Sequence, residues 1–124
     1  MKNTLRISLV QTNTIWEDIK GNLENLSVKM NDIDNDTDLI ILPELFSTGF
    51  TMQAKGVAES MTGQSVQWML QQASDKNCLV TGSVLIEEKN HFYNRLIVAF
   101  PGGALKFYDK RHLFSFAGED KVFK

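Results

Sequence analysis

Apolar and polar positions follow strand-like patterns in five segments of this chain. Residues 5–11 (LRISLVQ) alternate apolar and polar side chains, which is typical of a half-buried strand. Residues 39–42 (LIIL) are branched and apolar without alternation, as in a strand covered on both faces. Apolar runs at 78–86, 92–100 and 105–108 predict three more strands.

Two segments between these strands have helical periodicity instead. From Asp18 to Ile33 the apolar residues recur at spacings of three and four, which places them on one stripe of a helix. A second helix is predicted to run to Lys76, with Thr62 as its N-cap and an apolar face directed inward. Residues 47–61 contain two glycines and little periodicity, and they predict an irregular loop.

The order of these elements predicts an α/β fold. Residues 87–90 (EEKN) are short enough for a hairpin, and residues 101–103 (PGG) form a second turn, so the last three strands are expected to be antiparallel. The earlier strands alternate with helices and are expected to be parallel. Two helices can cover one face of this sheet. The other face needs a second sheet, another subunit or further chain.

Composition excludes several classes of protein. The 124 residues suffice for one domain, spanning 1–124, and the net charge of −2 argues against nucleic-acid or polybasic membrane binding. The apolar runs are too short for a signal peptide or a membrane span. One cysteine excludes an internal disulfide. We therefore expect a cytoplasmic protein without nucleic-acid or membrane partners.

Glu44 stands where the second predicted strand ends. Pro43 has no N–H to donate and ends the ladder, so Glu44 is expected at the rim of the sheet, where α/β proteins place their chemistry. Because Leu45 and Phe46 follow it, we expect apolar surroundings that raise the pKa of Glu44 and make it a general base near neutral pH. An ordinary surface glutamate is an equally supported interpretation.

Two charged residues near the end of the chain could share that rim. Lys110 follows the fifth predicted strand as Glu44 follows the second, and a fixed cation there could stabilise a developing oxyanion. The alternative is a solvated charge cluster of residues 109–111. Glu119, which follows Gly118, could hold the lysine or orient a substrate amine, or it could be an ordinary loop acid.

The segments LPELFSTGF and YDKRHLFSFAGED, together with the pair Tyr93-Asn94, resemble the carbon-nitrogen hydrolase (nitrilase) superfamily and its omega-amidase branch. The resemblance implies an α-β-β-α sandwich, of which this chain would be the N-terminal part, and a Glu-Lys-Cys triad that needs no metal or organic cofactor. By motif, Glu44 would be the general base and Lys110 would stabilise the tetrahedral intermediate. Glu119 would be the family's second, positioning glutamate.

The triad's nucleophile has no match in this chain. In the family it lies after the lysine motif, beyond Lys124. Cys78 opens an apolar strand and is expected to be a buried packing residue. We therefore interpret the chain as the N-terminal part of an amidase, either a fragment or a truncated gene product, and expect it to be inactive alone.

The expected substrate is a small carboxamide. The branch favours an omega-amide of a dicarboxylic 2-oxo acid, and Arg111 is a candidate for binding its carboxylate. A catalytically inactive assembly module is the second hypothesis, and a thiol redox protein built on Cys78 is the least supported one. An uncovered apolar sheet face would also favour self-association. His91 and His112 lack metal-ligand spacing, so no metal site is expected.

Overall fold

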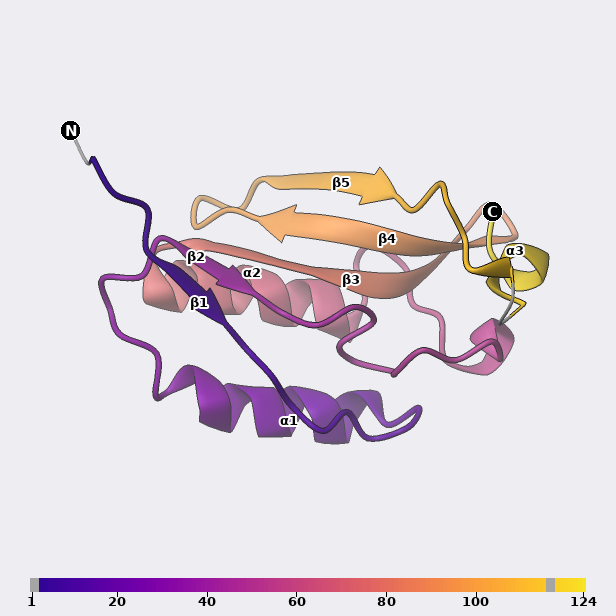
Figure 1. The fold of residues 1–124 in the computed structure, drawn as a ribbon, viewed down its shortest axis with the longest axis horizontal. Coiled ribbons are helices and arrows are strands. Elements are labelled where there is room, and N and C mark those ends of the chain that lie inside the picture. The colour runs from indigo at the N-terminus through magenta and orange to yellow at the C-terminus, as the bar shows by residue number, and fades with distance from the viewer. Residues whose placement is uncertain (1–2, 116–117) are drawn as a thin grey trace.

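The structure is a computed structural model that describes residues 3–115 and 118–124. It contains a five-stranded sheet of strand order β1-β2-β3-β4-β5, with helices packed against it (Figure 1). The elements in chain order are β1 (Ile7–Leu9), α1 (Ile19–Met30), β2 (Leu39–Ile41), the 3-10 helix η1 (Ala54–Gly56), α2 (Gln64–Lys76), β3 (Leu79–Glu88), β4 (His91–Ala99), β5 (Leu105–Asp109) and α3 (Glu119–Val122).

The predicted strand pairing is confirmed. Strands β1, β2 and β3 are parallel, whereas β3-β4 and β4-β5 are antiparallel. The turn between β3 and β4 consists of Lys89 and Asn90, whose φ angles of 51° and 64° are those of a two-residue hairpin turn. The long β3-β4 ladder is therefore fixed in register, which matters because both strands contribute to the site described below.

The main core lies between the sheet and the helices α1 and α2. Alternate residues of β3 face the helices, including Val80, Val84 and Ile86, and they pack against Leu26 of α1 and Met69 of α2. Helix α1 is shorter than the predicted 18–33 segment: Asp18 is its N-cap, and the helix ends at Met30. The two helices lie next to each other, so they form one layer.

The predicted N-cap of α2 is wrong. Helix α2 begins at Gln64 with Gly63 as its N-cap, and Gly63 has no side chain to cap the helix. The hydroxyl of Thr62 lies 3.0 Å from that of Ser60 instead. The carboxylate of Glu59 accepts the backbone N–H of Ser65 at 2.9 Å, so a residue from before the helix satisfies the orphan donor that Thr62 was expected to satisfy.

Residues 47–61 are more regular than the predicted irregular loop. They contain η1, and Glu59 makes a parallel bridge with Ile86 of β3. Together with α3 they cover one end of the sheet face opposite the helices, where a second small core contains Leu45, Leu85 and Phe123. This end of the face is therefore closed by chain that the sequence pattern did not assign to any element.

The rest of that face is exposed. Register places Ile7 and Leu9 of β1 on the same face as Leu96 of β4 and Tyr108 of β5. Their exposed fractions are 49%, 74%, 43% and 52% in that order, which is high for apolar and aromatic residues of a sheet. The expectation that α1 and α2 cover one face only is confirmed for the described residues. No helix among them is long and apolar enough to span a membrane.

Candidate active site

Glu44 lies in a turn that is held against β3. The backbone N–H of Leu45 donates to the hydroxyl of Ser83 at 2.8 Å, and that of Phe46 donates to the carbonyl of Ser83 at 3.3 Å. Gly82 permits this close approach, because a Cβ there would lie 2.8 Å from Cβ of Leu42. Leu45 adopts a left-handed backbone, with φ of 48°, which reverses the chain immediately after Glu44.

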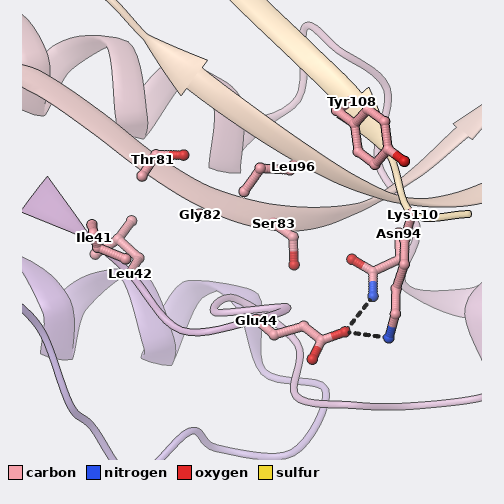
Figure 2. Close-up of a pocket in the computed structure, with 10 residues that line it drawn as sticks. All are labelled: Ile41, Leu42, Glu44, Thr81, Gly82, Ser83, Asn94, Leu96, Tyr108 and Lys110. Atoms are coloured by element: carbon pink, nitrogen blue, oxygen red, sulfur yellow. Dashed lines mark hydrogen bonds and ion pairs between the residues drawn. The ribbon is translucent and has the colours of Figure 1, made fainter. Parts of the chain in front are cut away.

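The expectation of apolar surroundings for Glu44 is wrong. Leu45 and Phe46 are fully buried, but they point into two different cores, and the side chain of Glu44 remains 50% exposed between them. Its Oε1 accepts hydrogen bonds from Nζ of Lys110 at 2.9 Å and from Nδ2 of Asn94 at 2.7 Å (Figure 2). The surroundings of this carboxylate are therefore set by polar donors.

Lys110 joins the two carboxylates of the site. Its backbone N–H donates to the carbonyl of Asn94 at 3.0 Å, which continues the β4-β5 ladder by one residue. Its Nζ lies 2.9 Å from Oε1 of both Glu44 and Glu119. Burial disfavours the ammonium, but the hydrogen bonds to Glu44 and Glu119 outweigh burial and raise the pKa of Lys110. The side chain is thus held as a cation.

Glu119 is the first residue of α3 and is completely buried. Besides Lys110, it accepts the backbone N–H of Phe114 at 2.6 Å and Nδ2 of Asn94 at 3.2 Å. Burial disfavours the charged form, but these donors together keep the pKa of Glu119 below its usual value. The structure thus places Glu119 against Lys110, as the interpretation that Glu119 holds the lysine predicted. Two residues of its sequence motif, Phe116 and Ala117, lie outside the described residues.

Asn94 belongs to the pair Tyr93-Asn94 that carried part of the family resemblance, but no role at the site was predicted for it. It lies in β4, is 3% exposed, and contacts Glu44 and Glu119 through its amide nitrogen. A buried amide inside a strand of mostly apolar residues needs partners, which is a signal that the sequence carried. Its partners, however, come from segments 50 and 25 residues away, and no local pattern could identify them.

A cavity of about 300 Å³ opens beside Glu44 and Lys110. Its polar end contains these two residues with Asn94, and side chains such as Leu96 and Tyr108 supply an apolar wall (Figure 2). Ten residues line it: Ile41, Leu42, Glu44, Thr81, Gly82, Ser83, Asn94, Leu96, Tyr108 and Lys110. The cavity thus combines a carboxylate and an ammonium with an apolar surface, as a site for a small organic molecule does.

Arg111 does not line this cavity. Its side chain is exposed and borders a neighbouring depression together with Phe107 and Lys124. Its role in binding a substrate carboxylate stays a prediction. Among residues 3–115 and 118–124, no three His, Cys, Asp or Glu side chains are grouped as ligands for a metal ion.

Cys78 is a packing residue, as expected. It is 4% exposed, lies immediately before β3 and belongs to the core on the helix side of the sheet. Burial raises the pKa of its thiol, and Asp38 adds to this effect, whereas Lys76 opposes it. It does not line the cavity beside Glu44.

Comparison with known proteins identifies the family of this chain. The carbon-nitrogen hydrolase family matches residues 6–124, so the chain belongs to this family. It is 38% identical over 121 residues to the omega-amidase YafV of Escherichia coli (strain K12). It is also 32% identical over 85 residues to the 2-oxoglutaramate amidase of Bacillus subtilis (strain 168), a match covering 66% of this chain and 33% of the relative.

Solved structures share the fold. A CN-hydrolase superfamily protein from Xanthomonas campestris, with an arsenic adduct in its active site, superposes with a TM-score of 0.93 at 42% identity. That match covers 97% of this chain and 45% of the Xanthomonas chain. The predicted α/β fold of the nitrilase type is therefore confirmed. The match to YafV likewise covers 97% of this chain and 46% of YafV, so the chain spans about half the length of these relatives.

Proposed function

We propose that the protein carrying this chain hydrolyses the carbon-nitrogen bond of small carboxamides, and of omega-amides in particular. The observation that carries the proposal is the meeting of Glu44, Lys110 and Glu119 beside an open cavity. These residues come from three separate segments, and a general base next to a fixed cation is what acyl transfer from an amide requires. The similarity to amidases supports this reaction class.

In the proposed mechanism a cysteine thiol is the nucleophile. Glu44 takes its proton, the sulfur attacks the amide carbonyl carbon, and Lys110 donates a hydrogen bond to the oxyanion that forms. Glu44 returns the proton to the nitrogen, so that ammonia leaves and a thioester remains. Water, deprotonated by Glu44, then attacks the thioester and releases the carboxylic acid and the thiol. The net reaction consumes one water for each amide bond.

We further propose that the nucleophilic cysteine comes from outside these 124 residues. Cys78 is buried on the helix side of the sheet, away from the cavity, and its raised pKa opposes thiolate formation. The carboxylate of Glu44 is half exposed and the cavity is open, so a further segment could approach both. On this proposal the 124 residues alone are inactive.

The proposed substrate carries a carboxylate at the end opposite its amide. Lys110 is committed to two glutamates, so it suits the oxyanion better than a substrate carboxylate. Arg111 is the next residue and has an exposed guanidinium, which can bind a carboxylate in a bidentate manner. We assign it this role within the proposal.

A second candidate function is assembly without catalysis. It is favoured by the exposed apolar side chains of Ile7, Leu9 and Leu96 on the face opposite α1 and α2. Exposed apolar side chains on a sheet face favour association. On this alternative, the isolated chain self-associates and no form of the protein hydrolyses amides.

The test is ammonia release by the full-length gene product with 2-oxoglutaramate as substrate. We expect turnover in the unmodified protein, and losses of about three orders of magnitude in Glu44→Gln and in Lys110→Ala. Cys78→Ala is the matched control, because it removes a thiol that the mechanism does not use. Full activity in either site variant would refute the residue assignment. No hydrolysis by the unmodified protein, with self-association of the chain, would support assembly instead.

A further inference from the structure

The amide of Asn94 lies between the two carboxylates of the proposed site. Its Nδ2 donates to Oε1 of Glu44 at 2.7 Å and to Oε2 of Glu119 at 3.2 Å. An amide nitrogen carries two hydrogens, so each carboxylate receives one. Chemistry fixes this orientation, because an amide oxygen turned toward two carboxylates would be repelled by both.

Asn94 also fixes the backbone of the lysine. Its carbonyl oxygen accepts the N–H of Lys110 at 3.0 Å, while its side chain holds Glu44 and Glu119. One residue therefore sets the positions of all three charged groups. Asn94 lies in β4, which is hydrogen-bonded to β3 on one side and β5 on the other. A residue of an inner strand is a more rigid support than a loop residue.

The two carboxylate oxygens of Glu44 differ in their hydrogen bonds. Oε1 accepts hydrogen bonds from both Asn94 and Lys110, so its two lone pairs are already occupied by donors. Oε2 accepts no hydrogen bond from the described part of the chain. The oxygen without a donor is the better proton acceptor, because protonating Oε1 would require a donor to be displaced.

We infer that Asn94 is a positioning residue that selects Oε2 of Glu44 as the oxygen that exchanges protons with the nucleophile and the leaving group. The inference rests on the proposed amidase function. A neutral amide suits the task, because it holds Glu44 without adding a second positive charge to the site. Without it, Glu44 keeps only the bond to Lys110 and can rotate about its side-chain torsions.

Asn22 provides a matched control. It is also 3% exposed, and its Nδ2 also donates two hydrogen bonds, to the carbonyl oxygens of Ile15 and Ser47 at 2.8 Å each. Its partners are backbone groups, so replacing it removes the same number of buried amide bonds without touching the charged cluster. Asn94→Asp and Asn22→Asp change the same atoms of the side chain, replacing an NH₂ donor by an oxygen.

The experiment measures kcat, KM and Tm of the full-length protein and its variants with 2-oxoglutaramate. We expect Asn94→Asp to lower kcat about 100-fold or more with KM changed less than about threefold, because the misplaced base affects the transition state more than substrate binding. Asn22→Asp is expected to lower Tm and leave kcat within about threefold. Asn94→Ser introduces a smaller, uncharged side chain and is expected to lower kcat as well. If Asn94→Asp does not fold, the same comparison is made with Asn94→Ser.

The outcomes separate this inference from the function on which it rests. An unmodified protein that does not hydrolyse the amide refutes the proposed function, and the inference with it. An active protein whose folded Asn94 variants retain kcat refutes the inference alone. A rise in KM without loss of kcat, or an equal loss of kcat in Asn22→Asp, also refutes it, because either would assign Asn94 a structural or binding role.

Discussion

The ammonium of Lys110 lies 2.9 Å from Oε1 of Glu119, although Glu119 is completely buried. Taking a carboxylate out of water is costly unless donors replace its hydration. Three donors do so here, namely Lys110, the amide of Asn94 and the backbone N–H of Phe114. The short helix α3 is thereby connected to the end of β5, and the cation next to Glu44 has a second carboxylate that holds it in place.

The first prediction concerns stability in acid. The pKa of Glu119 is below its usual value in the folded protein, so the unfolded chain takes up the proton first as the pH falls. The stability that this carboxylate contributes is present above the pKa of the unfolded chain, near 4.5, and is lost as the pH falls through the lower folded value. We expect Glu119→Gln to be less stable at pH 7 by about 2 kcal/mol, since it loses hydrogen bonds to a charged group.

Urea unfolding between pH 7 and pH 3 measures this effect. The unmodified protein is expected to lose more stability over that range than Glu119→Gln, so the two curves converge in acid. Asp120→Asn, next in sequence and exposed, is the control that removes a carboxylate from the same helix. Parallel curves for the unmodified protein and Glu119→Gln would contradict the prediction.

The second prediction concerns the contact between β3 and the Glu44 turn. A methyl group at Gly82 would lie 2.8 Å from Cβ of Leu42 and 3.0 Å from Cδ2 of Phe46. Both neighbours are buried and cannot move freely, so Gly82→Ala is expected to destabilise the protein by about 1–3 kcal/mol. Gly102→Ala is the control, because nothing lies within 4 Å of its added methyl group. Equal Tm values for the two variants would show that the turn adapts without cost.

The third prediction concerns the support of that turn by Ser83. Its hydroxyl accepts the backbone N–H of the fully buried Leu45 at 2.8 Å. Ser83→Ala leaves this N–H without that acceptor, which we expect to cost about 1–3 kcal/mol in unfolding free energy. Ser74→Ala, on the exposed side of α2, is expected to change stability by less than about 0.5 kcal/mol. Chemical denaturation of both variants measures the difference, and a neutral Ser83→Ala would mean that another group accepts the N–H.

Sequence patterns predicted the parallel and antiparallel pairing of the strands and the positions of Glu44 and Lys110 at strand ends, because those features depend on local information. Glu119 was a candidate by motif. Pro43 has no N–H to donate to a sheet ladder, so the position of Glu44 just after a strand could be predicted from the neighbouring residues alone. The buried position of Asn94 and the helical start at Glu119 depend on partners brought together by the fold. Of the two interpretations of Glu44, the one with apolar surroundings was wrong for a similar reason, since Leu45 and Phe46 turn into different cores.

The last prediction concerns Arg95, which lies in β4 next to Asn94 and holds the end of β5. Its side chain is 2% exposed, and its Nε donates to Asp109 at 2.7 Å, one residue before Lys110. Two longer hydrogen bonds, of 3.2 and 3.3 Å, reach Glu88, and the guanidinium carbon lies 4.1 Å from the ring centroid of Phe107. The hydrogen bonds to Asp109 raise the pKa of Arg95, and they outweigh burial, which lowers it.

A lysine at position 95 keeps the positive charge but loses the planar fork and its stacking on the ring. We therefore expect Arg95→Lys to lower the unfolding free energy by about 2 kcal/mol. Arg6→Lys is the control, because Arg6 pairs with Asp36 at 3.3 Å while both side chains are at least 60% exposed. This change is expected to lower the unfolding free energy by less than about 0.5 kcal/mol. Because Asp109 directly precedes Lys110, Arg95→Lys is also expected to lower kcat in the full-length protein. A variant that loses stability but keeps kcat would show that β5 holds Lys110 without this ion pair.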